Sequence, residues 1–296
     1  KQIVLGVGDS AVCTITNNDQ PASVTLIKNV INQYNGPYGV SDFILYVTKG
    51  DTSTEVKSGI ATIFDAGTYE ASEVNLAGYS AGSWTGDCDA DGNLKVSLGG
   101  DYKCYLTNTA QPVTLRVHKK VINDNGGTKN TSDFKFDVNE TTGYGFDNDG
   151  SEDTTTLTLS AGTYTVTEDE STAVGYQASY EGCSNIEAKN GVEYDCYITN
   201  DDIAPRVTVY KHSNPCYTDK YFDFAVSQNE EQYAEFSLTG GCNEEDGNYW
   251  STEEHLQAGQ ISVVEQNSGS DWYQEDAYCM NISKFVRSES FDPSNF

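Results

Sequence analysis

The sequence has little positive charge, few histidines and no long hydrophobic run. Lysine and arginine number 17 against 45 aspartate and glutamate residues, so the formal net charge is −28. A protein that binds nucleic-acid backbones or anionic lipid needs a basic surface, and this composition excludes both functions. No apolar run approaches the ~18 residues of a membrane span. The three histidines, His118, His212 and His255, lie far apart in the sequence and leave little for metal binding or acid–base catalysis.

Cysteine, by contrast, is frequent, with eight residues in a chain of 296. Hydrophobic residues make up 37% of the chain, so domains of ~100 residues would have small cores that need covalent support. An even number of cysteines among β patterns predicts disulfides made in an oxidising compartment. The chain starts at Lys1 without a signal peptide, so we expect a processed protein that is secreted or at the cell surface.

Short phrases recur along the chain at a fixed spacing. The phrase Gly-x4-Cys-x-[Ile/Leu]-Thr-Asn occurs three times, at intervals of 91 and 92 residues, and a lysine follows each time after 11 residues. The phrase Ala-Gly-x-[Tyr/Ile]-x3-Glu also occurs three times, and Ser-Asp-Phe at 41–43 returns at 132–134. The recurring polar residues are Asn17, Asn108 and Asn200, Lys28, Lys119 and Lys211, and Glu73, Glu168 and Glu265. This fixed order predicts three tandem repeats.

The local pattern within each repeat is typical of β-strands. Segments such as 154–159 and 164–167 are rich in β-branched and aromatic residues, and turn clusters such as 147–150 separate them. No segment has a convincing helical period. The sequence therefore predicts an all-β protein with a β-sandwich in each repeat. We expect an N-terminal strand at 1–20 and three domains, at 21–110, 111–204 and 205–296.

The order of these phrases resembles a known family. A lysine in the first strand, Gly-x-Tyr-x-x-x-Glu late in the repeat and Thr-Asn in the last strand resemble the prealbumin-like B repeats of collagen adhesins and sortase-type pilins. The run at 163–202 looks especially like the tandem repeats of large exported prokaryotic surface proteins. The third repeat departs most, because Ile261 replaces the tyrosine and an extra pair, Cys216 and Cys242, appears. The resemblance implies Ig-like, prealbumin-like domains.

In that family a lysine and an asparagine side chain fuse into an isopeptide bond, with a glutamate as proton shuttle. The resemblance therefore implies two sites, which are listed here by repeat: Lys28, Glu73 and Asn108 in the first, and Lys119, Glu168 and Asn200 in the second. The chemistry is sound, because a buried lysine tends towards the neutral, nucleophilic amine. The alternatives are a buried Lys–Glu pair without a bond, and a lysine that reaches the surface.

Repeat position also predicts how the cysteines pair. Cys88 with Cys104 and Cys183 with Cys196 lie at equivalent positions, 16 and 13 residues apart, and fit adjacent strands. Cys216 with Cys242 remains by elimination within the third repeat. Metal binding by thiolates is the alternative, and the absence of nearby histidines and of C-x-x-C pairs disfavours it.

Each end of the chain has a part of the repeat that the other end lacks. Residues 12–17 (Val12, Cys13, Thr14, Ile15, Thr16 and Asn17) are a terminal strand without a repeat before them, whereas the third repeat has Lys211, Glu265 and Cys279 but no Thr-Asn strand. If residues 12–17 inserted into the third repeat of a neighbouring chain, the strand would gain a sheet and the repeat would gain its last strand. Because the two surfaces lie at opposite ends of the chain, such a contact propagates head to tail. We then expect a Cys13–Cys279 disulfide and a Lys211–Glu265–Asn17 site between subunits. The alternatives are a fragment of a longer array, a last strand supplied by the tail, and a strand that folds back on its own chain.

The sequence thus predicts the structural subunit of an extracellular, pilus-like filament whose partners are copies of itself. The competing function is a stalk or binding module of a monomeric adhesin, with a host or cell-surface ligand. An enzyme finds little support, because no catalytic constellation is evident. No cofactor is expected except Ca²⁺, for which Asp87, Asp89 and Asp91 have the opening spacing of a binding loop, and a solvated acidic loop is the alternative. Asn130, Asn139 and Asn281 begin glycosylation sequons.

Overall fold

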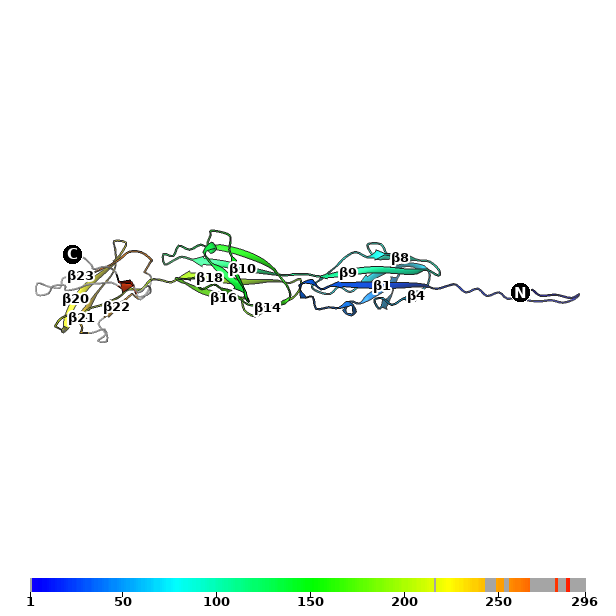
Figure 1. The fold of residues 1–296 in the computed structure, drawn as a ribbon, viewed down its shortest axis with the longest axis horizontal. Coiled ribbons are helices and arrows are strands. Elements are labelled where there is room, and N and C mark those ends of the chain that lie inside the picture. The colour runs from blue at the N-terminus through cyan, green and yellow to red at the C-terminus, as the bar shows by residue number, and fades with distance from the viewer. Residues whose placement is uncertain are drawn as a thin grey trace. The chain divides into compact units, whose positions relative to one another are not determined.

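The computed structural model describes residues 2–215, 217–242, 249–252, 256–266, 280–281 and 286–287. Within these residues the protein is all-β, as the sequence predicts (Figure 1). The helical elements described there are short 3-10 turns, η1 (Gln33–Asn35), η2 (Val40–Asp42) and η3 (Thr131–Asp133). None of the helices in this part of the chain is long and apolar enough to cross a membrane.

The chain forms two compact units. The first consists of residues 1–117, 154–166 and 181–196, and the second of residues 118–153, 167–180 and 197–296. The first unit therefore holds the first predicted repeat, the second unit holds the third, and the second repeat is divided between them. The domain limits expected from the sequence accordingly remain a prediction.

The first repeat is built from two sheets. One has the order β4-β1-β9-β6, with β7 also paired to β9, and the other has the order β3-β2-β5-β8. Their strands are β1 (Ala22–Ile31), β2 (Leu45–Lys49), β3 (Thr52–Val56), β4 (Thr62–Phe64), β5 (Gly67–Glu73), β6 (Tyr79–Ala81), β7 (Thr85–Gly86), β8 (Asn93–Val96) and β9 (Asp101–Ala110). The first strand, β1, and the last, β9, run parallel. The inward side chains of both sheets, among them Leu26, Val47, Leu94 and Leu106, share one core.

The second repeat is built from three sheets. Its largest sheet is β13-β10-β18-β16, and smaller sheets are β12-β11-β15 and β14-β17. The strands are β10 (Val113–Ile122), β11 (Lys135–Val138), β12 (Thr141–Gly145), β13 (Glu152–Leu159), β14 (Gly162–Tyr164), β15 (Val166–Glu168), β16 (Tyr176–Glu181), β17 (Ile186–Ala188) and β18 (Glu193–Asp202). In β10 and β18 alternate residues are buried, as expected for strands with one face on a core.

The third repeat is described in part. Its strands are β19 (Thr208–Tyr210), β20 (Tyr217–Gln228), β21 (Glu231–Gly240), β22 (Tyr249–Ser251), β23 (Ile261–Gln266), β24 (Met280–Asn281) and β25 (Val286–Arg287). They form the sheets β21-β20-β23, β19-β22 and β24-β25. Phe222, Phe224 and Leu238 make its core, with Trp250 packed against them. Aromatic side chains thus make up a large part of the described core of the third repeat.

The segment before β1 has no strand within residues 2–21. Its large apolar side chains are all exposed: Ile3, Val4, Leu5, Val7, Val12 and Ile15. The strand predicted at 12–17 was expected to pair with another chain, and a single chain does not test that expectation.

Candidate isopeptide sites

The first site lies where strands of the two sheets face each other. Lys28 on β1 follows the buried Leu26 at the strand period of two, so its side chain points into the core, and the residue as a whole is 3% exposed. Its Nζ atom lies 2.5 Å from Oε2 of Glu73 on β5. Asn108 on β9 donates from Nδ2 to the other carboxylate oxygen, Oε1, at 2.6 Å. One carboxylate therefore bridges the amine and the amide.

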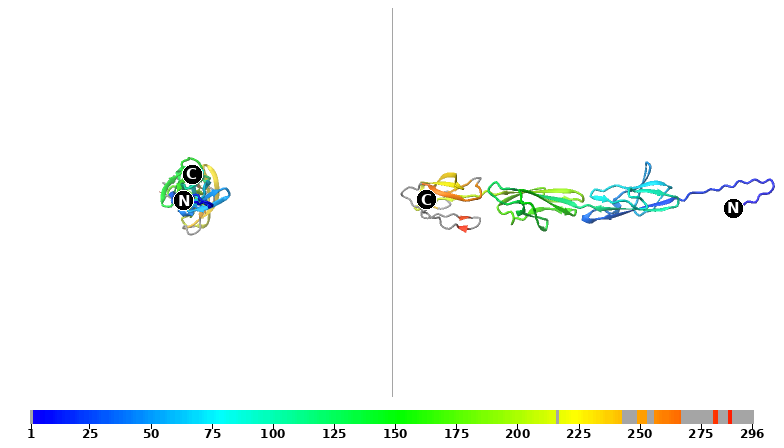
Figure 2. Two further views of the ribbon diagram at one scale, coloured as in Figure 1. Left: turned by 90° about the vertical axis from the view of Figure 1, so that its right-hand side faces the viewer. Right: turned by 90° about the horizontal axis from the view of Figure 1, so that it is seen from above.

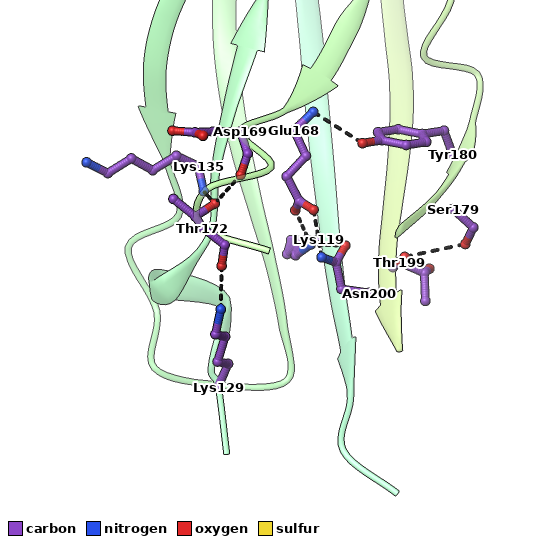
Figure 3. Close-up of polar contacts among 10 residues, drawn as sticks. All are labelled: Lys119, Lys129, Lys135, Glu168, Asp169, Thr172, Ser179, Tyr180, Thr199 and Asn200. Carbon is purple, nitrogen blue, oxygen red and sulfur yellow. Dashed lines mark hydrogen bonds and ion pairs between the residues drawn. The ribbon is translucent and has the colours of Figure 1, made fainter. Parts of the chain in front are cut away.

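The second site has the same three residue types and one further hydrogen bond, since Oδ1 of Asn108 in the first site is buried without a partner among the described residues (Figure 3). Lys119 on β10 donates from Nζ to Oε1 of Glu168 and to Oδ1 of Asn200, both at 2.5 Å. Asn200 on β18 donates from Nδ2 to Oε2 of Glu168 at 2.6 Å. The Tyr180 hydroxyl accepts the backbone N–H of Glu168 at 3.3 Å. The structure thus brings together all six residues that the sequence assigned to these two repeats.

Burial changes the protonation of both lysines. Lys28 and Lys119 have side chains with no exposed surface, and this desolvation lowers the pKa of each amine below its ordinary value, although the hydrogen bond to the glutamate opposes the effect. A lowered pKa increases the fraction of neutral amine, which is the nucleophilic form. The bridging carboxylate is placed to move a proton between the amine and the amide nitrogen.

An aromatic ring lies beneath each lysine, and the sequence analysis did not assign it a role. The Nζ atoms of Lys28, Lys119 and Lys211 lie 4.4, 4.0 and 4.3 Å from the ring centroids of Phe43, Phe134 and Phe222, in that order. The rings close the pocket and add cation–π attraction for the protonated amine. The repeated Ser-Asp-Phe phrase was the available signal for the first two rings. The third repeat lacks this phrase, and fewer residues separate its lysine from the phenylalanine than in the other two repeats.

The third site contains two of its three predicted members. Lys211 donates to Oε2 of Glu265 at 2.9 Å, and their side chains are 18% and 16% exposed, compared with 5% or less at the other two sites. Asn17, the expected third member, is exposed on the N-terminal segment and makes no hydrogen bond with this pair in the described part of the chain. Lys211 and Glu265 are therefore paired like the lysines and glutamates of the other two sites, but their side chains are more exposed to solvent.

In each of the first two repeats a disulfide links the last strand to a loop that precedes it in the sequence. The structure joins Cys88 to Cys104 and Cys183 to Cys196, with Cα–Cα distances of 5.3 and 4.6 Å. These are the two pairs that repeat position predicts. Cys242 is also disulfide-bonded, and Cys216, its predicted partner, lies outside the described residues. Cys13 is free and exposed, while Cys279 lies outside the described residues.

The acidic loop at 87–91, for which the sequence left a calcium site and a solvated loop open, does not form a ligand cluster. Asp87 accepts the backbone N–H of Lys103, whereas Asp89 accepts those of Asp91 and Asn93, so the carboxylates serve separate backbone turns. Hydrogen bonds from Asn93 lower the pKa of Asp89. Within the described ranges, the acidic side chains that do converge are Asp124, Asp201 and Asp202.

Two of the three sequon asparagines have described side chains. Asn130 and Asn139 are both exposed. Asn281 lies in β24, where the description does not extend to side chains. Glycosylation at the three asparagines therefore stays a prediction.

A family model for the prealbumin-like fold domain matches residues 19–106 and 110–195. The chain belongs to this family. Prealbumin-like repeats of this kind are structural, non-enzymatic domains, in agreement with the sequence prediction. The two matches span the first and second repeats up to the middle of β18, and residues beyond 195 lie outside them, as expected for a divergent third repeat.

A comparison with solved structures finds matches of low sequence identity. The Bacillus anthracis TIE protein is 15% identical with a TM-score of 0.48, covering 89% of this chain and 46% of its own. Two B repeats of the Staphylococcus aureus collagen-binding protein are 13% identical with a TM-score of 0.27, covering 89% and 72%. The Streptococcus pyogenes major pilin is 15% identical with a TM-score of 0.28, covering 63% and 99%. This chain thus spans about half the length of the first protein. No curated protein sequence matches it.

Proposed function

We propose that the protein is the structural subunit of an extracellular, pilus-like filament that polymerises head to tail by donor-strand exchange. The observation that carries the proposal is the pairing of β19. Its counterpart in the first repeat, β1, pairs with β4 on one side and with β9 in parallel on the other. In the described part of the third repeat β19 pairs with β22, and the parallel pairing described there is a single bridge between His212, two residues after β19, and Gly241.

The N-terminal segment has the residues that this edge requires. In β9 the buried side chains alternate at Cys104, Leu106 and Asn108. Counted from the shared phrase, the corresponding residues of the segment are Cys13, Ile15 and Asn17. Ile15 is 84% exposed in the single chain, so insertion into a sandwich would remove a large apolar surface from water.

The same register supports two cross-links between subunits. Cys13 would meet Cys279 as Cys104 meets Cys88, and Asn17 would complete the pair of Lys211 and Glu265. The greater exposure of that pair fits a pocket whose third member comes from another copy. At such a joint the disulfide would keep the subunits together on heating without reductant. The isopeptide bond would keep them together in reductant as well.

Within each chain we propose that Lys28 bonds to Asn108 and Lys119 bonds to Asn200. Nζ attacks the amide carbon Cγ, the glutamate passes the amine proton to Nδ2, and the Cγ–Nδ2 bond breaks to release ammonia. Atoms balance without a cofactor or an oxidant. The reaction joins the first and last strands of a repeat once and has no turnover.

Electron micrographs and gels of native material test the proposed filament. We expect filaments in negative stain, and in detergent with reductant a ladder whose steps are the 32.3 kDa chain. If the disulfide alone links the subunits, reductant and heat should collapse the ladder to one band. Single particles with free ends, together with one band under non-reducing conditions, would instead favour the stalk of a monomeric adhesin.

Replacing Phe134 by alanine is expected to slow bond formation in the second repeat. The ring lies 4.0 Å from the lysine amine, and its loss admits water, which returns the pKa of Lys119 towards its ordinary value. The cavity should also cost about 3–5 kcal/mol of stability. Phe136→Ala is the matched control, because this phenylalanine is equally buried but lies under no lysine. Time-resolved intact mass should show slower loss of ammonia for Phe134→Ala alone, and equal slowing in both variants would contradict the role of the ring.

A further inference from the structure

The N-terminal segment contains a turn that the two complete repeats also contain. In Figure 2 this segment doubles back on itself. In all three turns the backbone N–H of the fourth residue donates to the carbonyl of the first at 3.2 Å. The third residue is always the glycine of the repeated phrase, with φ of +94°, +68° and +71°. The turns are Gly6–Asp9, Ser97–Gly100 and Lys189–Val192, and their glycines are Gly8, Gly99 and Gly191.

In the complete repeats, the strand before this turn belongs to the opposite sheet. β8 pairs with β5, and β17 pairs with β14. The buried residues of β8 are Leu94 and Val96, which precede the turn glycine by five and three residues. At the same distances before Gly8 the N-terminal segment has Ile3 and Leu5, which are 59% and 53% exposed.

The third repeat has an open edge in that sheet as well. The first repeat has the order β3-β2-β5-β8, and the third has β21-β20-β23. Among the described residues β23 therefore pairs on one side only. β25 follows Cys279 at about the distance at which β8 follows Cys88, but it pairs with β24 and not with β23. The third repeat thus offers two edges, one beside β19 and one beside β23.

We propose that the N-terminal segment donates two strands to the neighbouring copy of this chain, one to each sheet. Residues 3–5 extend the sheet of β23, the turn at Gly6–Asp9 crosses between the layers, and residues 12–17 lie beside β19. The inference rests on the proposed filament, and it adds a second strand to the joint. The occupant of both edges is the same segment of a second copy.

The repeats fix the register of the added strand. Gly67 pairs with Val96 and Tyr69 with Leu94 in the first repeat. Gly162 pairs with Ala188 and Tyr164 with Ile186 in the second. The corresponding residues of the third repeat are Gly259 and Ile261, so Leu5 of one copy pairs with Gly259 of the next, and Ile3 pairs with Ile261.

A cysteine pair tests this register in the full chain. Facing residues of antiparallel strands have Cα atoms close enough for a disulfide. Filaments of the double variant Ile3→Cys, Ile261→Cys should therefore contain a 3–261 disulfide between two chains, found by non-reducing peptide mapping. The matched control is Val4→Cys with Ile261→Cys, since residue 4 points to the opposite face of the strand, and it should form no such bond.

The outcomes separate this inference from the proposed filament. Filaments that carry the Cys13–Cys279 bond but no 3–261 bond would overturn the second strand and leave donor-strand exchange intact. A 3–261 bond within one chain would overturn it as well. An unmodified chain that forms no filaments would refute both proposals.

Polar substitutions give an independent measurement. Ile3→Asp with Leu5→Asp should raise the subunit concentration needed for assembly about a hundredfold, because two apolar side chains lose their burial. Val4→Asp should change it little, since the corresponding residues Lys95 and Glu187 are exposed. Equal effects in both variants would contradict the proposed orientation of the strand.

Discussion

A chain with Ile15 replaced by aspartate is expected to remain monomeric under conditions in which the unmodified chain polymerises. The residues that correspond to Ile15, Leu106 and Ile198, are 3% and 1% exposed in the cores of their repeats. Donor-strand exchange would bury Ile15 to the same extent in the neighbouring subunit. An aspartate there would place an unpaired charge in an apolar core, and several kcal/mol of desolvation would oppose assembly.

Thr14→Asp is the matched control for this variant. The residues that correspond to Thr14 in the first two repeats, Tyr105 and Tyr197, are 37% and 47% exposed. A charge at residue 14 would therefore face solvent, and assembly should continue. Size-exclusion chromatography and negative-stain imaging of both variants decide the question. Filaments from Ile15→Asp that match those of the unmodified chain would show that residues 12–17 are not the inserted strand.

Glu168→Gln is expected to block the isopeptide bond of the second repeat while the first repeat keeps its own. Each bond releases one ammonia, so the unmodified chain should weigh about 34 Da less than its sequence mass after disulfides are allowed for, and the variant about 17 Da less. A glutamine keeps the shape of Glu168 but cannot relay the proton from Lys119. The first repeat serves as an internal control in the same molecule.

The missing bond should also lower the melting temperature of the second repeat. Lys119 and Asn200 are 81 residues apart, and a cross-link that closes a loop of this size contributes about 4.5 kcal/mol. That corresponds to a fall in Tm of about 20 °C for a domain of this size. Glu193→Gln is a suitable control, because Glu193 is 60% exposed and pairs with Arg116 at the surface. Equal masses and melting temperatures for Glu168→Gln and the unmodified chain would rule the bond out.

The repeat pattern located the recurring polar residues, and the family resemblance predicted which of them meet inside the sandwiches. Lys28, Glu73 and Asn108 are distant in sequence, yet each takes an inward position on its strand, and the same spacing in the second repeat places Lys119 beside Glu168. Cysteine pairing followed from the same logic, since equivalent positions lie at equivalent distances. Equivalent positions in the repeats therefore help to predict contacts between residues that are far apart in the sequence, which local β propensity does not predict.

Features without a repeated polar residue were harder to predict. The Ser-Asp-Phe phrase marks the phenylalanine of the first two repeats but not its place beneath the lysine, which the distance from the ring to the amine shows. The spacing of Asp87, Asp89 and Asp91 suggested convergent ligands, whereas backbone N–H groups engage two of the three. The sequence predicts a strand at 1–20, whereas the structure has a turn at Gly6–Asp9, whose hydrogen bond the repeated phrase does not specify.

The parallel pairing of β1 with β9 determines how the first repeat would carry a mechanical load. The nine residue pairs run from Ser23 and Asp101 to Ile31 and Thr109, and the chain enters the repeat at the start of β1 and leaves it at the end of β9. Tension applied through the chain therefore pulls the two strands along each other, so that the interstrand hydrogen bonds share the force instead of opening one after another. The repeat is thus arranged in shear, a geometry that suits a protein under traction.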